Sequence, residues 1–294
     1  MSEMQLSEQD SPRPSPETPT MTPDFDSLAA TATELRRDVL RMLHAAASGH
    51  PGGSLGMTDV FTTLFFGGHL RNDPSNPGWE DRDRFVLSNG HICPILYAIL
   101  AHQGFFPREE LLTLRKLGSR LQGHPDTHDT PGVDACTGSL GNGVSVALGM
   151  AMGARLKGRD FRVYVGSSDG ESQEGQVWEM ASAAAHYEVD NLTVLVDRNG
   201  IQIDGFTKDV MDQGDLAAKY EAFGWHVQRV DGHDLRALHA ALETAKTVKG
   251  KPQMIECATV LGKGVSFMEN VPKWHGVAPN DEQLAQALEE LGGG

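Results

Sequence analysis

Two short stretches decide the fold: residues 161–170 read FRVYVGSSDG and residues 192–200 read LTVLVDRNG. Each begins with a run of β-branched and other apolar residues, as expected for a buried strand, and each ends in polar residues and a glycine. A helical pattern over residues 175–187 separates them, and strands and helices continue to alternate as far as residue 260. This alternation predicts an α/β fold with a mostly parallel central sheet and helices on both faces.

The spacing of apolar residues gives the order of the other elements. Helices are predicted at residues 27–47, 58–66, 91–103, 108–117, 143–156, 175–187, 216–223 and 235–248. Strands are predicted at residues 161–166, 192–197, 225–230 and 253–260. The run Ser48-Gly49-His50-Pro51-Gly52-Gly53 predicts the end of the first helix and a loop after it. Because no internal repeat or linker is visible, residues 25–294 are expected to form one domain.

Composition narrows the classes of protein. Residues 1–24 are rich in Ser, Pro, Glu and Thr, which predicts a disordered tail, and they lack the pattern of a signal peptide. No apolar run approaches the ~20 residues of a membrane helix, so no membrane partner is expected. The three cysteines, Cys93, Cys136 and Cys257, are widely spaced. This spacing excludes a CxxC metal site and argues against a disulfide framework, which favours a cytoplasmic location.

The balance of charge bears on the ligand. The formal net charge is −15, which argues against nucleic acid as a partner because phosphate backbones bind basic surfaces. An anionic ligand would need a locally positive site on this acidic chain. A metal ion, histidines or helix N-termini would supply it.

The ends of the two quoted strands carry the candidate metal site. Ligands of an open parallel sheet bind beyond the carboxyl ends of its strands. If the two strands are neighbours, Asp169 and Asn199 lie together there. Their side-chain oxygens and the Ile201 carbonyl form an oxygen donor set that suits Mg²⁺ or Ca²⁺, with positions left for phosphate oxygens and water. Gly170 would let the backbone approach a phosphate closely. Composition leaves an alternative open, in which Asp169-Gly170 and Asn199-Gly200 are both ordinary turns.

Beyond these residues, the chain resembles the N-terminal half of the transketolase family from about residue 26 to residue 280. The segment from Asp169-Gly170 to Asn199 resembles the thiamine diphosphate signature of that family. The resemblance rests on seven blocks in the family's order: SGHPGGSLG (48–56), LSNGH (87–91), GHP (123–125), TGSLGNG (137–143), DGESQEG (169–175), NGIQIDG (199–205) and HG (275–276). It implies a thiamine diphosphate-binding fold, with thiamine diphosphate and Mg²⁺ as cofactors and Ca²⁺ as an alternative ion.

The resemblance also assigns roles to individual residues. It implies that Asp169, Asn199 and Ile201 hold the metal, and that His50 and His124 face the substrate. His91 and His275 would face the cofactor diphosphate. The catalytic set is then His50, His124 and His275. The cofactor-binding set is His91, Gly138, Leu140, Gly170, Glu174, Asn199 and His275. Histidine suits such roles because it titrates near neutral pH and can donate to developing oxyanions.

The sequence differs from the transketolase family pattern in two of the quoted blocks, and the role of Glu174 needs separate comment. Ser168 stands where the family usually has glycine. In the run of residues 138–143, Ser139 and Asn142 stand where the family usually has proline and glutamine. A serine at 168 costs little if its φ is negative and is strained if its φ is positive. Glu174 would lie at a subunit interface by resemblance, although a carboxylate at the start of a helix is also favourable by itself.

The resemblance places one essential group outside this chain. Thiamine catalysis needs a glutamate that protonates the aminopyrimidine. In the transketolase family this glutamate lies in a second domain, which would follow residue 294. We therefore expect a separate C-terminal transketolase subunit that carries the glutamate, in an α₂β₂ heterotetramer. A piece cut from a longer protein is the alternative.

The predicted function is transfer of a two-carbon ketol unit from a ketose phosphate to an aldose phosphate, with exchange in the pentose phosphate pathway as the default. Two other thiamine diphosphate enzymes stay open as alternatives: a deoxyxylulose-phosphate synthase-like subunit and a keto acid dehydrogenase-like subunit. A cofactor-binding paralogue without turnover is a third. A dinucleotide-binding domain is disfavoured because residues 138–143 have the wrong glycine spacing.

Overall fold

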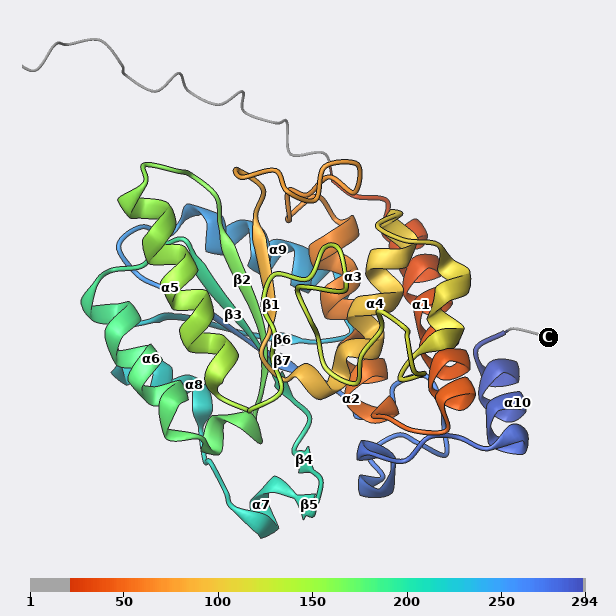
Figure 1. Cartoon of the computed structure of the whole chain (residues 1–294). Helices are drawn as coiled ribbons and strands as arrows, with labels where there is room; N and C mark the ends of the chain where they lie inside the picture. Colours follow the sequence, from red (N-terminus) through yellow and green to blue (C-terminus); the bar gives the residue numbers. More distant parts are fainter. Residues whose placement is uncertain (1–21, 293–294) are drawn as a thin grey trace, which may run out of the picture.

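The computed structural model describes residues 22–292, and its centre is a five-stranded parallel sheet (Figure 1). The strands lie in the order β1-β2-β3-β7-β6. Their bounds are β1 Arg84–Leu87, β2 Val163–Ser168, β3 Leu192–Arg198, β7 Gln253–Ala258 and β6 His226–Asp231. A small antiparallel hairpin, β4 Ile201–Gln202 with β5 Gly205–Phe206, extends from the end of β3. The predicted mostly parallel sheet is confirmed.

Helices cover both faces of this sheet, as predicted (Figure 1). On one face lie α1 Phe25–Ala46, α3 Thr58–Phe66, α4 Cys93–Gln103 and α9 Leu235–Thr247. On the other face lie α5 Asn142–Leu156, α6 Gly175–His186 and α8 Leu216–Ala222. The remaining helices are α2 Pro51–Gly56, α7 Thr207–Val210 and α10 Asp281–Glu290, with 3₁₀ turns η1 Gly90–Ile92, η2 Arg108–Thr113, η3 Glu171–Gln173 and η4 Pro272–His275. In the part of the chain that the structure describes, no helix is long and apolar enough to cross a bilayer.

Alternating side chains of each strand divide the apolar core into two. In β3, Leu195 points into the core beneath α1, α3, α4 and α9, whereas Val194 and Val196 point into the core beneath α5, α6 and α8. All three side chains are fully buried. This explains why the strand reads as an unbroken apolar run, since a strand covered on both faces needs apolar residues at every position.

Two predictions about local structure were wrong, and one strand of the central sheet was missed. Residues 48–53 were expected to form a loop, but α2 begins at Pro51 and is buried throughout. Proline at the first helical position is compatible with a helix because its missing N–H has no partner there anyway. The helix expected at residues 108–117 is the shorter 3₁₀ turn η2. Strand β1 was not predicted, because four residues are too few to show a period.

The N-terminal boundary of the fold lies at α1. Residues 1–21, which carry most of the predicted disordered tail, are outside the described residues. Asp24 is the N-cap of α1, and its carboxylate accepts hydrogen bonds from the backbone N–H groups of Asp26 and Ser27.

Candidate functional site

The site lies where the carboxyl ends of β1, β2, β3 and β7 meet along one edge of the sheet. Strands β2 and β3 pair in parallel, with Ser168 opposite Asp197, so their polar ends are adjacent. The Asp169 N–H continues this pairing and donates to the Asp197 carbonyl over 3.0 Å. The condition for the predicted metal site, that the two strands are neighbours, is therefore met.

Asp169 is a buried carboxylate with little positive charge around it. Its side chain accepts hydrogen bonds from the N–H of Gly170 at 2.8 Å and the N–H of Gly200 at 2.7 Å. Among the ion pairs of the described residues, its cationic contact is Arg198, whose guanidinium lies 3.6 Å from Oδ2. Burial raises the pKa of Asp169 to about 6, against the lowering effect of these neighbours. A cation beside Asp169 would favour its ionised form.

Asn199 and Ile201 follow Asp169 around the same edge. The Asn199 Oδ1 accepts from the Ile201 N–H at 2.8 Å, and a carbonyl oxygen keeps a second lone pair. The set thus combines a carboxylate, an amide oxygen and a backbone carbonyl, which are hard ligands of the kind that Mg²⁺ binds. The donor chemistry and the shortage of positive charge both fit a divalent cation.

A second buried carboxylate, Asp197, was missed by the sequence analysis. It accepts a hydrogen bond from Asn199 Nδ2 at 2.8 Å and another from the Thr259 hydroxyl. Burial, together with the neighbouring Asp169 carboxylate, raises the pKa of Asp197 to about 7. The bond to Nδ2 orients the Asn199 amide, so that its oxygen faces away from Asp197. The sequence feature that could have identified Asp197 is its place as the last residue of the apolar run LTVLVD.

The loop after β7 is fixed by His233, which matched no motif in the sequence. The Asp59 carboxylate contacts His233 Nδ1 at 2.8 Å, and the Val260 N–H donates to His233 Nε2 at 2.9 Å. Accepting at Nε2 makes Nδ1 the donor to Asp59. Asp59 is held in turn by a buried ion pair with Arg36. This chain of contacts holds Thr259 beneath Asp197.

Three of the four predicted histidines form a compact cluster. The ring centroids of His50 and His91 are 5.0 Å apart, those of His50 and His275 are 5.6 Å apart, and those of His91 and His275 are 5.3 Å apart. His50 is the N-cap of α2, His91 lies in η1 and His275 ends η4. The Nδ1 atoms of His50 and His275 are buried and have no hydrogen-bond partner among the described residues. Such unpaired polar atoms are expected where a polar ligand binds.

Burial keeps this cluster neutral. Desolvation is the largest cause of a lowered pKa in all three rings, with the other histidines adding to the effect at His50 and His91. The pKa of His50 falls to about 4 and that of His91 to about 3. A neutral imidazole donates at one nitrogen and accepts at the other. Near neutral pH each ring can therefore donate a hydrogen bond at one nitrogen and accept one at the other.

The lowered pKa of His91 predicts how stability depends on pH. An unfolded histidine binds protons below about pH 6.5, whereas folded His91 stays neutral, so this contribution is complete above pH 6.5 and is lost as pH falls. Between pH 7 and pH 5, His91 should cost the chain about 2 kcal/mol of unfolding free energy. His91→Asn should flatten the wild-type dependence by that amount in urea titrations. His186→Asn, at an exposed position of α6, should keep the wild-type slope, and parallel curves for His91→Asn would contradict the prediction.

His124, Gly138 and Leu140 lie on two segments beside the cluster. A Cβ built on Gly138 would be 3.6 Å from the His124 ring, so the two residues are adjacent. The segment from Thr137 to Gly141 carries Leu140 and is tied to the sheet edge at both ends. The Thr137 hydroxyl donates to the Leu87 carbonyl at 2.7 Å, and the Gly141 N–H donates to Glu171 Oε1 at 2.8 Å. His124 is exposed, and desolvation with the nearby Arg115 lowers its pKa.

Two glutamates of the DGESQEG block have different surroundings. Glu171 was not singled out from the sequence, yet it is fully buried and accepts from the hydroxyls of Ser88 at 2.5 Å and Ser167 at 2.7 Å. It thereby joins the ends of β1 and β2, and burial raises its pKa. Glu174, a predicted interface residue, is the exposed N-cap of α6 and makes no capping bond with its side chain.

Ser168 fits its position without strain. The described non-glycine residues with positive φ are Ala47, Arg115, Glu188 and Asn270, so neither Ser168 nor Asn142 needs the left-handed region. The Ser168 hydroxyl accepts the Glu171 N–H at 3.2 Å, a contact that glycine could not make. The unusual serine thus adds a hydrogen bond to the turn after β2.

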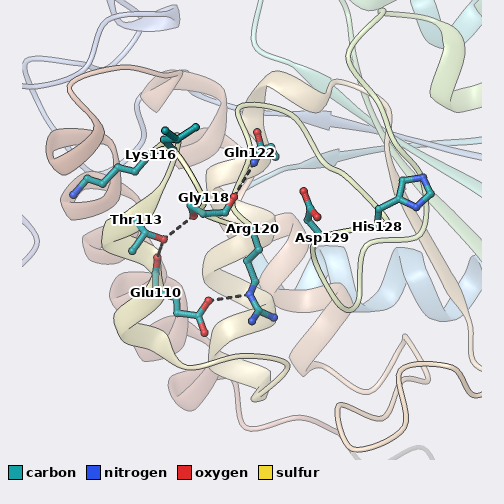
Figure 2. Close-up of a pocket in the computed structure, with 10 residues that line it drawn as sticks. Glu110, Thr113, Lys116, Gly118, Arg120, Gln122, His128 and Asp129 are labelled. Carbon is teal, nitrogen blue, oxygen red and sulfur yellow. Dashed lines mark hydrogen bonds and ion pairs between the residues drawn. The ribbon is translucent and has the colours of Figure 1, made fainter.

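Two cavities differ in their relation to this site. One of about 370 Å³ lies between the β4–β5 hairpin and η4, and His275 lines it together with Asp204 and Lys273. Another, of about 800 Å³, lies around η2 and is lined by none of the predicted residues (Figure 2). Two of its charged groups pair with each other, since Arg120 Nε contacts Glu110 Oε2 at 2.9 Å. The cavity beside His275 is the one that belongs to the site.

Known proteins share both the sequence and the fold. The family model described as transketolase, thiamine diphosphate binding domain, matches residues 28–293. The 6-deoxy-6-sulfo-D-fructose transketolase subunit SqwG of Clostridium sp. (strain MSTE9) is 43% identical over 260 residues, which are 88% of this chain and 94% of that protein. An apulose-4-phosphate transketolase subunit of Actinobacillus succinogenes is 39% identical over 268 residues, 91% of this chain and 96% of that protein.

A solved structure extends the likeness to three dimensions. Transketolase from Leishmania mexicana superposes with a TM-score of 0.86 at 36% identity, over 90% of this chain and 41% of that one. The chain thus spans about two-fifths of that larger transketolase and nearly all of the two proteins named as subunits. With the family match covering residues 28–293, the chain belongs to the transketolase family and carries its thiamine diphosphate-binding domain.

Proposed function

We propose that this chain is the diphosphate-binding subunit of a two-chain, Mg²⁺-dependent transketolase, which moves a two-carbon ketol unit from a ketose phosphate to an aldose phosphate. The observation that carries the proposal is the match, along 94% and 96% of their lengths, to two proteins named as transketolase subunits. The sheet-edge carboxylates and the histidine cluster supply matching chemistry. The three free cysteines fit action in the cytoplasm.

The metal and the diphosphate would be held at the ends of β2 and β3. Asp169, Asn199 and the Ile201 carbonyl are the metal ligands, and Asp197 orients the Asn199 amide. Gly170 brings its backbone to this edge without a side chain in the way. His91 and His275 face the diphosphate, and Gly138, Leu140 and Glu174 complete the cofactor-binding set. Support comes from the buried oxygen donors and from the carboxylate charge that a divalent cation would balance.

The histidines would act on the sugar. Bound thiamine diphosphate supplies the nucleophilic carbon at which the ketose is cleaved. His50, His124 and His275 would hold the substrate oxygens and move protons between them. Their lowered pKa values favour the neutral form, in which one nitrogen accepts a hydrogen bond while the other donates one. The unpaired Nδ1 atoms of His50 and His275 are available for these contacts.

The rest of the site would come from a separate C-terminal transketolase subunit that carries the catalytic glutamate. Glu174, exposed at the start of α6, would contact that chain. An α₂β₂ heterotetramer satisfies the need for both halves at each site. The named relatives act on apulose 4-phosphate and 6-deoxy-6-sulfo-D-fructose. We infer a ketose substrate with an anionic end group, of which phosphate is the first choice.

Reconstitution tests the proposal. The purified chain should transfer no ketol unit by itself, because the proposed partner supplies the catalytic glutamate. Mixing it with the chain encoded next to it, plus Mg²⁺ and thiamine diphosphate, should give transfer between ketose and aldose phosphates. The panel should include xylulose 5-phosphate, apulose 4-phosphate and 6-deoxy-6-sulfo-D-fructose. Turnover by the isolated chain would contradict the split site, and a pair that binds cofactor yet transfers nothing across the panel would contradict the transferase assignment.

A further inference from the structure

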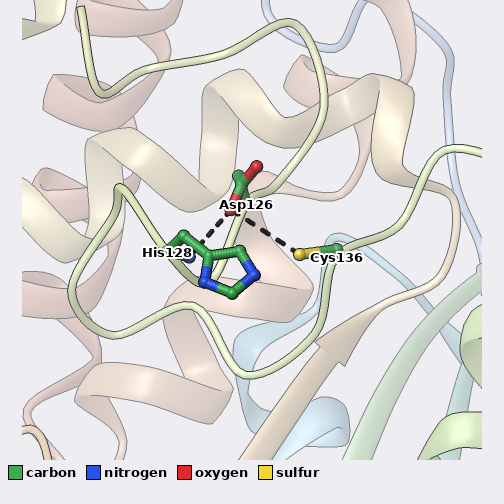
Figure 3. A group of neighbouring side chains, drawn as sticks. All are labelled: Asp126, His128 and Cys136. Carbon is green, nitrogen blue, oxygen red and sulfur yellow. Dashed lines mark hydrogen bonds between the residues drawn. The ribbon is translucent and has the colours of Figure 1, made fainter.

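The loop of residues 122–137 brings three different metal-ligating side chains together outside the site described above. These are the carboxylate of Asp126, the imidazole of His128 and the thiol of Cys136, and Figure 3 shows them converging. One ligand atom from each lies within 4.8 Å of the others. Asp126 is half-buried, while His128 and Cys136 are exposed, so an ion could reach them from solvent.

The spacing of the group matches tetrahedral coordination. Cys136 Sγ lies 3.6 Å from Asp126 Oδ1. A tetrahedral ion with bonds of about 2.3 Å to sulfur and about 2.1 Å to oxygen would hold these two atoms about 3.6 Å apart. The sulfur and oxygen therefore need not separate to admit an ion. The imidazole would complete three protein ligands, which leaves a fourth position for water.

The types of ligand select the ion. Mg²⁺ and Ca²⁺ prefer oxygen ligands, whereas thiolate and imidazole favour zinc and similar ions. This loop therefore differs in preference from the Asp169–Asn199 edge, whose donors are all oxygens. The two places on the chain should sort different ions from a mixture.

Hydrogen bonds hold two of the three ligands, Asp126 and Cys136, before any ion arrives. The Thr127 N–H donates to Cys136 Sγ at 3.3 Å, and the His128 N–H donates to Asp126 Oδ1 at 2.7 Å. The two limbs of the loop are joined by a backbone bond from the Thr137 N–H to the Pro125 carbonyl at 3.3 Å. Cys93 and Cys257 are buried, so Cys136 is the thiol open to solvent. Such support keeps ligand atoms in place and lowers the cost of binding.

We propose that Asp126, His128 and Cys136 form a binding site for a thiophilic divalent cation of the zinc class, with one ion per chain. The site lies two residues from His124 on one limb and two residues from Gly138 on the other. A bound ion would link these limbs and fix the separation of the segments that carry both residues. The inference concerns ion binding, so it does not depend on the proposed transferase activity.

Cobalt spectroscopy of the full chain tests the site, with Mg²⁺ in excess. A thiolate ligand gives Co²⁺ a near-ultraviolet charge-transfer band that oxygen and nitrogen ligands do not give. The band should appear, saturate at a single cobalt per chain, and disappear when Zn²⁺ is added. Cys136→Ser should remove it and His128→Ala should weaken it. Asp129→Asn, a neighbouring exposed position outside the group, should leave it unchanged.

Alkylation gives an independent measurement. Iodoacetamide should modify Cys136 in the chelator-treated chain, and stoichiometric Zn²⁺ should slow that reaction at least about tenfold, because a coordinated thiolate is a poor nucleophile. Far-ultraviolet circular dichroism of each variant checks that it is folded. Absence of the cobalt band in the folded wild-type chain would overturn the proposal. So would a band that survives Cys136→Ser, or alkylation that Zn²⁺ leaves unchanged.

Discussion

Asp169→Ala should lower the affinity of the assembled two-chain enzyme for thiamine diphosphate in the presence of Mg²⁺ by about 100-fold or more. Loss of a residue that merely supports a ligand already costs about 10–100-fold in metal affinity. Asp169 is the charged member of the proposed set, and Asn199 and Ile201 would be left as neutral donors. The diphosphate would then enter a buried edge that still carries Asp197. Calorimetric titration with thiamine diphosphate, with and without Mg²⁺, measures the effect.

Two further variants separate binding from folding. Asp169→Asn keeps the size of the side chain and removes its charge, but its single amide oxygen can accept only one of the two N–H groups, Gly170 or Gly200, that the two carboxylate oxygens accept. It should therefore fold with a modest loss of stability while losing most of the Mg²⁺-dependent affinity. Asp26→Asn, at an exposed position in the first turn of α1, is the matched control and should bind normally. Wild-type affinity in Asp169→Ala would show that the metal is held elsewhere.

Gly53→Val should lower the free energy of unfolding by about 3 kcal/mol. Gly53 lies inside α2, and even a Cβ at this position would be 2.7 Å from Ile92 Cγ2 and 3.8 Å from Asp197 Oδ2. Ile92 is itself buried, so it has no free space to move into. The branched valine would push α2 away from the sheet edge and displace His50 at its start. Urea unfolding of the isolated chain gives the free energy.

Substitution of a second helical glycine should change the free energy of unfolding in the opposite direction. Gly149 lies in the middle of α5, and a Cβ there would meet nothing within 4 Å. Gly149→Ala should therefore raise the free energy of unfolding by about 0.5–1 kcal/mol, because alanine loses less backbone entropy on forming a helix. If Gly53→Val left the free energy of unfolding unchanged or raised it, close packing of α2 against Ile92 would not be the reason for glycine at position 53.

The sequence predicted the helices and strands whose own residues show a clear pattern of apolar positions. The run LTVLVD is apolar at every position because β3 is covered on both faces, and this made the parallel sheet visible. The same reasoning from local pattern gave the wrong structure for the segment that starts at Pro51. Its glycines read as a loop, yet they are there because Leu261 and Ile92 approach α2 too closely for side chains. That reason comes from parts of the chain far away in sequence.

The residues of the site also divide into those that local sequence identifies and those that depend on tertiary packing. Asp169 and Asn199 were found because they directly follow strands. The histidine cluster came from the family resemblance, since many histidines here are beside glycine and adjacency alone distinguishes none of them. Asp197 and Glu171 were missed because their burial and shifted pKa values arise from tertiary packing. Asp126 and Cys136 lie on opposite limbs of one loop, and no spacing rule for metal motifs connects them.

The order of the strands also affects how the protein emerges from the ribosome. β7 is the last strand in the chain, yet it lies between β3 and β6. During synthesis, β3 therefore presents an open hydrogen-bonding edge, and β6 has no partner in the sheet until residue 258 is free. Thr259, which contacts Asp197, follows immediately. The nascent chain thus completes its sheet and the contact of Thr259 with Asp197 in a single event, and until then its exposed β3 edge is a target for chaperones and for wrong pairing.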